Sequence, residues 1–307
     1  PPVAGGSSAA APAAPARLVP KARRMSTYSL RIRFEVATKD VSFTAPPDYQ
    51  ESFAFWTGKM KGQKRSELFE FVTLTQEARQ DGSVPFRRTL PRFNMDLEKG
   101  GVPFQPYGPL QGQVQTMEWE GLLDPLGRVR EIKVITDADN EEAKLLAWAQ
   151  VDHAFPILEG PTEVAQGGSF TETLSLPMPQ RLNVLGLEEI RHRVERRYTL
   201  RARGGDLASF EVQVVYALDP ATPAQAPGTT CTITGGGAGE AVFNLRRGVF
   251  VNTRLPTTMR IDIEAPLRRL PHQPEGSDPG KATTRIDLDL MLIGNLDVKR
   301  LWGEEDD

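Results

Sequence analysis

The sequence has few of the residues that build disulfides, metal sites and membrane spans. Its 307 residues include one cysteine and three histidines. A lone Cys231 cannot form an internal disulfide or a cysteine-based zinc site, and no apolar run reaches the ~20 residues of a membrane-spanning helix. With 37 basic and 40 acidic residues, the net charge of −3 lacks the basic surplus of a general nucleic-acid binder. We therefore expect no cofactor, no metal, no nucleic-acid partner and no transmembrane span.

Glycine and proline are abundant, at 27 and 25 residues, and suit a chain of strands and turns. From Tyr28 to Val36, apolar residues alternate with polar ones, which predicts a half-buried strand. The same alternation returns in segments 210–218, 259–263 and 286–292. These patterns predict a mainly β protein.

Residues 187–201 fit both a helix and a strand. As a strand, the segment would turn Ile190, His192, Val194 and every second residue through Leu200 to one face. The strand-rich surroundings and the following Gly204-Gly205 turn favour the strand.

One helix is expected, between the two halves of the chain. Asp139 or Asn140 can cap its start, and it ends before Pro156. Leu145, Leu146, Trp148 and Ala149 form its apolar stripe. We expect this connecting helix, within residues 139–160, to bury Trp148 against the concave face of a sheet.

The two halves of the chain resemble each other in outline. Segment 113–134 and segment 240–254 both read as a strand, a turn opened by Asp or Asn and closed by Gly, and a returning strand. This likeness predicts two similar antiparallel curved-sheet modules, at residues 27–138 and 161–295, joined by the one helix.

Both ends of the chain are expected to lie outside these modules. Residues 1–20 are nearly all Pro, Ala, Gly, Ser and Val, so they can bury too little apolar surface to offset their ordering entropy. We expect a flexible tether over residues 1–26, of which residues 1–20 are dispensable for folding, and an acidic tail over residues 296–307.

Two segments could suggest bound phosphate or calcium. A phosphate-binding glycine loop opens a helix, whereas Gly235–Gly239 precedes a segment that alternates as a strand, so we expect a mobile hairpin loop. The acidic residues 137–142 could suggest a calcium loop, which needs Gly at its sixth position and Glu at its twelfth. Those positions hold Glu142 and Trp148, which favours a charged helix start.

The sequence contains no recognisable catalytic arrangement. His153 and Asp152 are adjacent, and neighbours in sequence do not face each other on a helix. His192 falls on the apolar phase of its strand and is expected to be a hydrogen-bonded core residue. Cys231 has no evident basic partner, so we expect a small buried hydrophobic residue. No nucleophile or metalloprotease motif is present, and we expect a protein that is not an enzyme.

The aromatic residues Phe53, Phe55 and Trp56, followed by Lys59 and Lys61, are the most suggestive stretch. Aromatic side chains beside a basic loop suit a membrane interface or a lipid. The alternative is an ordinary core strand that leads into a solvated loop. Together with Trp148, these three aromatic residues are our candidates for ligand binding.

Several short motifs carry a resemblance to a known group of proteins. They are G-x-V-x-T-x-E-W at 112–119, D-P-x-G-R-V at 124–129, L-P-M-P at 176–179, R-R-Y-T-L at 196–200 and G-x-A-x-F-N at 239–244. With the tether, this layout resembles uncharacterised bacterial envelope proteins, often lipoproteins, built from two curved β-sheet repeats. It is distantly similar to periplasmic lipoprotein carriers, which cradle acyl chains. The resemblance implies a bacterial periplasmic protein tethered to the outer membrane, with a lipid anchor upstream of Pro1 and no catalytic residues to transfer.

Three functions remain open at this point. The first is a non-enzymatic cell-envelope protein that binds a lipid, a glycan or a partner protein. The second is a structural subunit of a larger envelope complex, and the third is a hydrolase with an unrecognised site. An apolar cavity would favour the first, a long unpaired edge strand the second, and a cleft with converging titratable groups the third.

Overall fold

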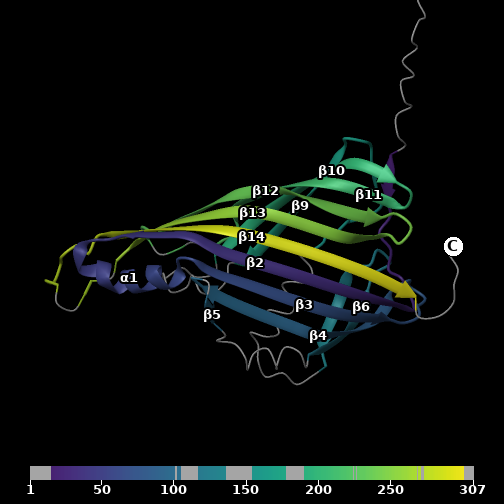
Figure 1. Cartoon of the computed structure of the whole chain (residues 1–307), viewed down its shortest axis with the longest axis horizontal. Helices are drawn as coiled ribbons and strands as arrows, with labels where there is room; N and C mark the ends of the chain where they lie inside the picture. Colours follow the sequence, from purple (N-terminus) through teal and green to yellow (C-terminus); the bar gives the residue numbers. More distant parts are fainter. Residues whose placement is uncertain are drawn as a thin grey trace, which may run out of the picture.

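The computed structural model describes residues 15–100, 102–104, 117–135, 154–177, 190–223, 225, 227–267, 269–270 and 273–300. The predicted mainly β, antiparallel fold is confirmed. A curved 12-stranded sheet dominates the molecule (Figure 1), and a separate two-stranded sheet accompanies it.

Each half of the chain supplies consecutive strands to the large sheet. The first half contributes β2 (Ser26–Thr44), β3 (Gln63–Thr75), β4 (Val84–Lys99), β5 (Val102–Phe104), β6 (Glu118–Leu123) and β7 (Val129–Val134). The second half contributes β9 (Ser169–Pro177), β10 (Arg191–Gly204), β11 (Leu207–Leu218), β12 (Thr230–Asn244), β13 (Val249–Pro266) and β14 (Lys281–Arg300). The strand β10 confirms the choice of strand over helix for segment 187–201.

The strands of the sheet that come first and last in the chain, β2 and β14, pair with each other and join the two halves. The strand order is β7-β6-β4-β3-β2-β14-β13-β12-β11-β10-β9, with β5 on β4. At the seam, β14 pairs antiparallel with β2 from Thr283↔Thr44 to Arg300↔Ser26. The modules expected at 27–138 and 161–295 therefore contribute to one continuous sheet, in which β7 and β9 are the two edges.

Both predicted hairpins are present, at different places in the sheet. The strands β6 and β7 pair at one edge, whereas β12 and β13 pair inside the sheet. Their internal similarity as a duplicated module stays a prediction.

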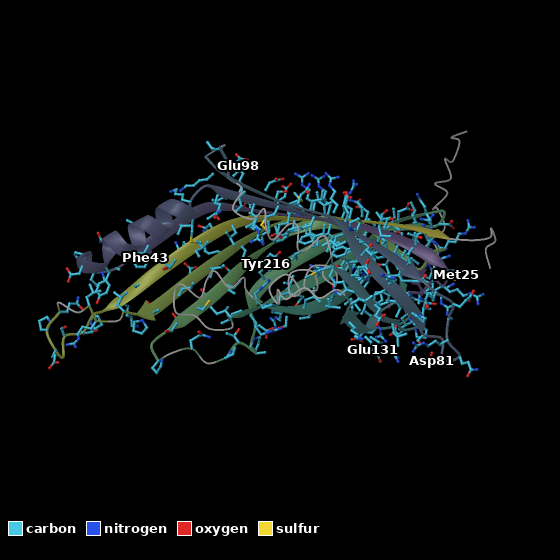
Figure 2. All side chains as sticks on the ribbon, turned by 90° about the horizontal axis from the view of Figure 1, so that it is seen from below. Met25, Phe43, Asp81, Glu98, Glu131 and Tyr216 are labelled. Atoms are coloured by element: carbon cyan, nitrogen blue, oxygen red, sulfur yellow. The ribbon has the colours of Figure 1, made fainter. Side chains whose placement is uncertain are left out.

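The two faces of the sheet differ in chemistry, as expected from the alternation. The concave side carries three large clusters of buried apolar side chains, and the labelled Tyr216 lies within the curve in Figure 2. The convex side carries ion pairs between neighbouring strands, including Arg31–Glu70, Arg260–Asp287 and Arg285–Asp262. This division is typical of an antiparallel sheet with one solvated face.

The tether expected over residues 1–26 is wrong for its second half. Ala16 and Leu18 are fully buried in strand β1 (Ala16–Leu18), which pairs with β8 (Thr162–Val164) and joins the core of the second half. Two apolar residues within a Pro/Ala-rich segment were enough to form a strand, because the distant strand β8 supplies hydrogen-bond partners for its backbone. Residues 1–14 lie outside the described residues.

Residues 21–25 continue from β1 across the turns at one end of the sheet. The backbone N–H groups of Lys21, Ala22 and Met25 donate to the carbonyl oxygens of Gly248, Pro125 and Gln76, at 3.2, 3.0 and 3.3 Å. Met25 lies at the end of the molecule opposite Phe43 (Figure 2). The segment thus ties turns of both halves together.

The mobile glycine loop expected at 235–239 is also wrong. These glycines lie within β12, between β11 and β13. Gly236 has a φ of +155°, and a Cβ there would lie 2.1 Å from the carbonyl oxygen of Val214. Only glycine permits this close approach between strands, so the run serves the tight packing of the sheet.

A helix that the sequence analysis did not predict lies at the other end of the molecule. Helix α1 (Pro47–Met60) begins with a proline in its first turn and an early Asp48, which are standard helix-start signals. Tyr49 is buried, and its hydroxyl donates to Gln273 Oε1 at 2.8 Å. No helix among the described residues is long and apolar enough to cross a membrane.

Most of the connecting helix expected at 139–160, namely residues 139–153, lies outside the described residues. Ala154 and Phe155, which are described, form a bend and not a helix. At the other end of the chain, the acidic tail expected from residue 296 is wrong in its first part. Strand β14 continues to Arg300, since its last residues pair with the start of β2.

Candidate functional site: the concave face

One part of the concave face is filled with aromatic and aliphatic side chains. One cluster, from the first half, contains Phe69, Phe93 and Trp119, and another, from the second half, contains Tyr198 and Phe210. Phe155 and Leu292 pack against both clusters. This part of the face is therefore a packed core that holds the two halves together.

Residues 154–158 cross the seam between the halves. A Cβ at Gly294 would lie 3.0 Å from the Phe155 ring and 3.3 Å from the Ala154 side chain. Gly294 on β14 thus gives these residues the space to pack closely on the sheet. Ala154 is fully buried there, and Leu158 is buried in the core cluster of the second half.

A band of half-buried apolar side chains adjoins this packed core, and we call it the apolar strip. Leu292 lies opposite Phe34, and Leu290 lies opposite Val36, across the β14–β2 seam. All members lie on the concave phase of their strands. The strip consists of Phe34, Val36, Leu174, Tyr216, Leu288, Leu290 and Leu292.

A buried ion pair lies on the same face, at the edge of the second half. Arg196 Nη1 on β10 lies 3.7 Å from Glu172 Oε2 on β9, and both side chains are under a tenth exposed. Glu172 Oε1 also accepts the backbone N–H of Ile157 at 2.9 Å, and Oε2 accepts the Tyr198 hydroxyl at 3.4 Å. Burial raises the pKa of Glu172, while Arg196 opposes that rise. The pair thus joins β9, β10 and the segment that crosses the seam.

The first half has its own ion pair, with a buried carboxylate, on the other side of the apolar strip. Arg65 donates to Glu67, two residues along β3. Glu67 is fully buried, and the Arg65 side chain is 24% exposed. Arg65 lies opposite Val36 and Glu67 opposite Phe34. The apolar strip therefore lies between two arginine–carboxylate pairs, one from each half.

Burial also controls the titration of two residues that sequence analysis considered. His192 is buried on the concave face as predicted, and burial lowers its pKa to about 4. Burial and the nearby Asp262 raise the pKa of Cys231 to about 11. His192 is therefore neutral and Cys231 a thiol near pH 7. Neither group is poised for acid–base or nucleophilic chemistry at that pH.

The convex face carries a depression of about 530 Å³ across β2, β14, β13 and β12. Its charged walls include Lys39, Arg260, Asp287 and Asp289. Lys39 pairs with Asp289 at 2.9 Å and Arg260 with Asp287 at 2.7 Å. Since these charges satisfy one another, the depression offers little to a charged ligand. Within the described residues, no group of acidic, histidine or cysteine side chains could hold a metal ion.

The predicted ligand-binding residues remain untested. Phe53, Phe55 and Trp56 lie in helix α1 and not in the expected strand or loop, and their side chains lie outside what the structure describes. Trp148 lies outside the described residues. The structure therefore does not bring these four residues together as a site.

Sequence reasoning missed both ion pairs of the concave face, although a signal was present. Glu172, Arg196 and Glu67 each fall on the apolar phase of an alternating strand. A charged residue in that phase must be paired when the face is buried. A charged residue at an apolar position of an alternating strand could therefore have indicated a buried ion pair on the concave face.

Comparison with protein-family models and with curated protein sequences finds no match. Among solved structures, the chain is similar at a TM-score of 0.20 and 9% identity to the Salmonella type III secretion secretin InvG, covering 95% of this chain and 63% of that one. The same TM-score and identity apply to the outer membrane protein OprG of Pseudomonas aeruginosa, with 90% and 97% covered. They also apply to the Escherichia coli K12 type II secretion secretin GspD, with 91% and 51% covered. A TM-score of 0.20 is too low to indicate a shared fold.

Proposed function

We propose that this chain is a non-enzymatic protein of the bacterial cell envelope that binds the acyl chains of a lipid on its concave face. The observation that carries the proposal is the half-buried apolar strip, set between two arginine–carboxylate pairs whose carboxylates are buried. Apolar surface with a few polar groups nearby is the usual lining of a small-molecule site. The composition of residues 1–14, nearly all Pro, Ala, Gly and Ser, supports a tethered location in the periplasm.

The strip differs from the rest of the concave face in its exposure. Phe69, Phe93 and Tyr198 in the packed core are fully buried, whereas Leu290, Leu292 and Val36 are half-buried. Covering partly exposed apolar side chains with a hydrocarbon chain stabilises a complex by about 25 cal/mol per Å² of apolar surface buried. The side chains that can still gain from a ligand are therefore those of the strip.

Binding of a fluorescent fatty acid by the purified chain tests the proposal. The variant Leu290→Gln places an amide at the centre of the strip and should weaken binding by about tenfold, or 1.4 kcal/mol. Leu207→Gln is the matched control, because Leu207 on β11 is 43% exposed and lies outside the strip. Circular dichroism confirms that both variants are folded. Wild-type protein that binds no fatty acid, or equal binding by both variants, would contradict the proposal.

A structural role in an envelope complex is the second candidate. The observation in its favour is the strand β9, which pairs with β10 alone among the described residues. An unpaired edge is a common route to strand addition by a partner.

A further inference from the structure

The two edges of the large sheet are built differently. At one edge, β7 has six residues, and Arg130, Glu131 and Lys133 place charges along it. The register between β7 and its neighbour β6 also shifts, between Leu122 and Leu123. Short length, charges and a bulge are the features that keep edge strands from pairing with other chains. The edge at β7 is therefore protected.

The other edge, β9, has fewer of these protections. Its nine residues pair with β10 without a register shift, from Ser169↔Thr199 to Pro177↔Arg191. The only charged residue in the strand, Glu172, points into the core and is buried. The outward-facing side chains are Ser169, Thr171, Thr173, Ser175 and Pro177, all exposed and uncharged.

The hydrogen-bonding pattern shows which backbone groups of β9 face the open edge. Leu200 N donates to Gly168 O at 2.9 Å, so alternate residues of β10 from Leu200 down to His192 direct their N–H and C=O groups toward β9. Their partners are the even-numbered residues of β9. The N–H and C=O groups of Thr171, Thr173 and Ser175 therefore point away from β10. Consistent with this, Arg191 Nη2 reaches the Ser175 carbonyl oxygen at 3.0 Å from the convex side.

We propose that β9 pairs with β9 of a second copy of this chain, antiparallel about a two-fold axis at Thr173. This inference goes beyond the proposed lipid binding and does not depend on it. Thr173 is the central residue of the strand, so this register overlaps its full length. It sets Thr171 against the second copy's Ser175, and Phe170 against its Leu176. Hydroxyl side chains then meet on the convex face. On the concave face, Phe170 meets Leu176 of the second copy, and Glu172, which is paired with Arg196, meets its Leu174.

Charge and symmetry favour a second copy over pairing between β9 and β7. Self-pairing of β9 sets only uncharged side chains against each other on the convex face, whereas the charges along β7 protect that edge against pairing with another strand. Pairing of one edge with the other would be head-to-tail and could continue into a filament, whereas a two-fold axis closes after two copies. The protected β7 edge leaves β9 as the edge available for association.

Disulfide cross-linking tests the register. In a Cys231→Ser background, Thr173→Cys should form a covalent dimer under mild oxidation, because the two copies meet at this residue. The Cα atoms of such a hydrogen-bonded pair are about 5.5 Å apart, within the range that a disulfide spans. Thr171→Cys is the matched control and should not cross-link, because it faces Ser175 of the second copy. Cross-linking of Thr171→Cys but not Thr173→Cys would overturn the proposed register.

Sedimentation equilibrium tests the association itself. Thr173→Lys adds a charge at the open edge, and Thr173→Pro removes an N–H that β10 does not use. Each should raise the dissociation constant of the dimer by at least about tenfold. Thr232→Lys, at an exposed position of the interior strand β12, should leave it unchanged. A monomeric wild type, or a dimer that survives both folded Thr173 variants, would overturn the inference. Fatty-acid binding by the monomer would still support the proposed function.

Discussion

The concave and convex faces of the sheet carry the same chemical pair, an arginine with a carboxylate, in two environments. On the concave face, Arg196 and Glu172 are both under a tenth exposed. On the convex face, Arg260 and Asp287 are 50% and 25% exposed at a separation of 2.7 Å. Water screens the convex pair, so its geometry can be good while its contribution to stability is small. The concave pair is largely shielded from water, so loss of one partner leaves the other charge buried.

The largest expected effect is on the concave pair. Arg196→Met should lower the free energy of unfolding by about 3–5 kcal/mol, because Glu172 would then be buried without its cation. Urea unfolding at pH 7 measures this loss. The double variant Arg196→Met/Glu172→Leu should recover much of it, since an apolar pair of similar volume needs no compensating charge. If Arg196→Met lowered the free energy of unfolding by less than about 1 kcal/mol, the concave pair would contribute no more than an exposed pair.

The next effect is a pH dependence that the concave face imposes on His192. Its pKa is about 4 in the folded chain, against an ordinary value of 6.5, so the unfolded chain binds more protons between these pH values. The stability from neutral His192 is complete above pH 6.5 and is lost as the pH falls toward 4. Between pH 7 and pH 4.5 we expect a loss of about 2–3 kcal/mol. The groups that act on His192 include Arg191, Asp219 and the Leu176 backbone.

Unfolding of wild type and His192→Gln at both pH values isolates this contribution. The raised pKa of Glu172 acts in the opposite direction, because a carboxyl that holds its proton in the folded state favours folding at low pH. Glu172 is present in both proteins, so its effect cancels in the comparison. An equal pH dependence of the two proteins would contradict the assignment to His192.

A smaller effect is expected at the concave pair of the first half. Arg65→Met should cost about 1–3 kcal/mol, because Glu67 loses a charged donor at a fully buried position. Arg65 itself is a quarter exposed, so water relieves part of the loss. Thermal unfolding beside Arg196→Met measures the difference between the halves. If Arg65→Met lost as much stability as Arg196→Met or more, the exposure of the arginine would not explain the difference between the two pairs.

The smallest effect is expected on the convex face. Arg260→Met should shift the unfolding midpoint by no more than about 2 °C, because an exposed pair contributes little. The shift should shrink further when salt is added, since salt screens exposed charges. A large, salt-insensitive shift would show that the convex pair is shielded from water after all.

The sequence alone determined the fold class and the face of many strands. Strict alternation in the first strand, in segment 187–201 and in the last strands separated the buried phase from the exposed one, because successive side chains of a strand point to opposite faces. Turn residues located the two hairpins. His192 was placed correctly on the concave face for the same reason.

Tertiary structure decided the features that depend on partners distant in sequence. The strand β1 forms because β8 lies far along the chain, and the glycine run is a strand because β11 and β13 approach on both sides. The pairing of β14 with β2 turns two expected modules into one sheet. The buried pair of Glu172 and Arg196 likewise joins neighbouring strands in a register that is fixed only when the whole sheet assembles. Local sequence patterns specify which side chains of a strand are buried and where the turns lie. The register of strand pairing and the identity of the edge strands depend on how all the strands assemble into one sheet.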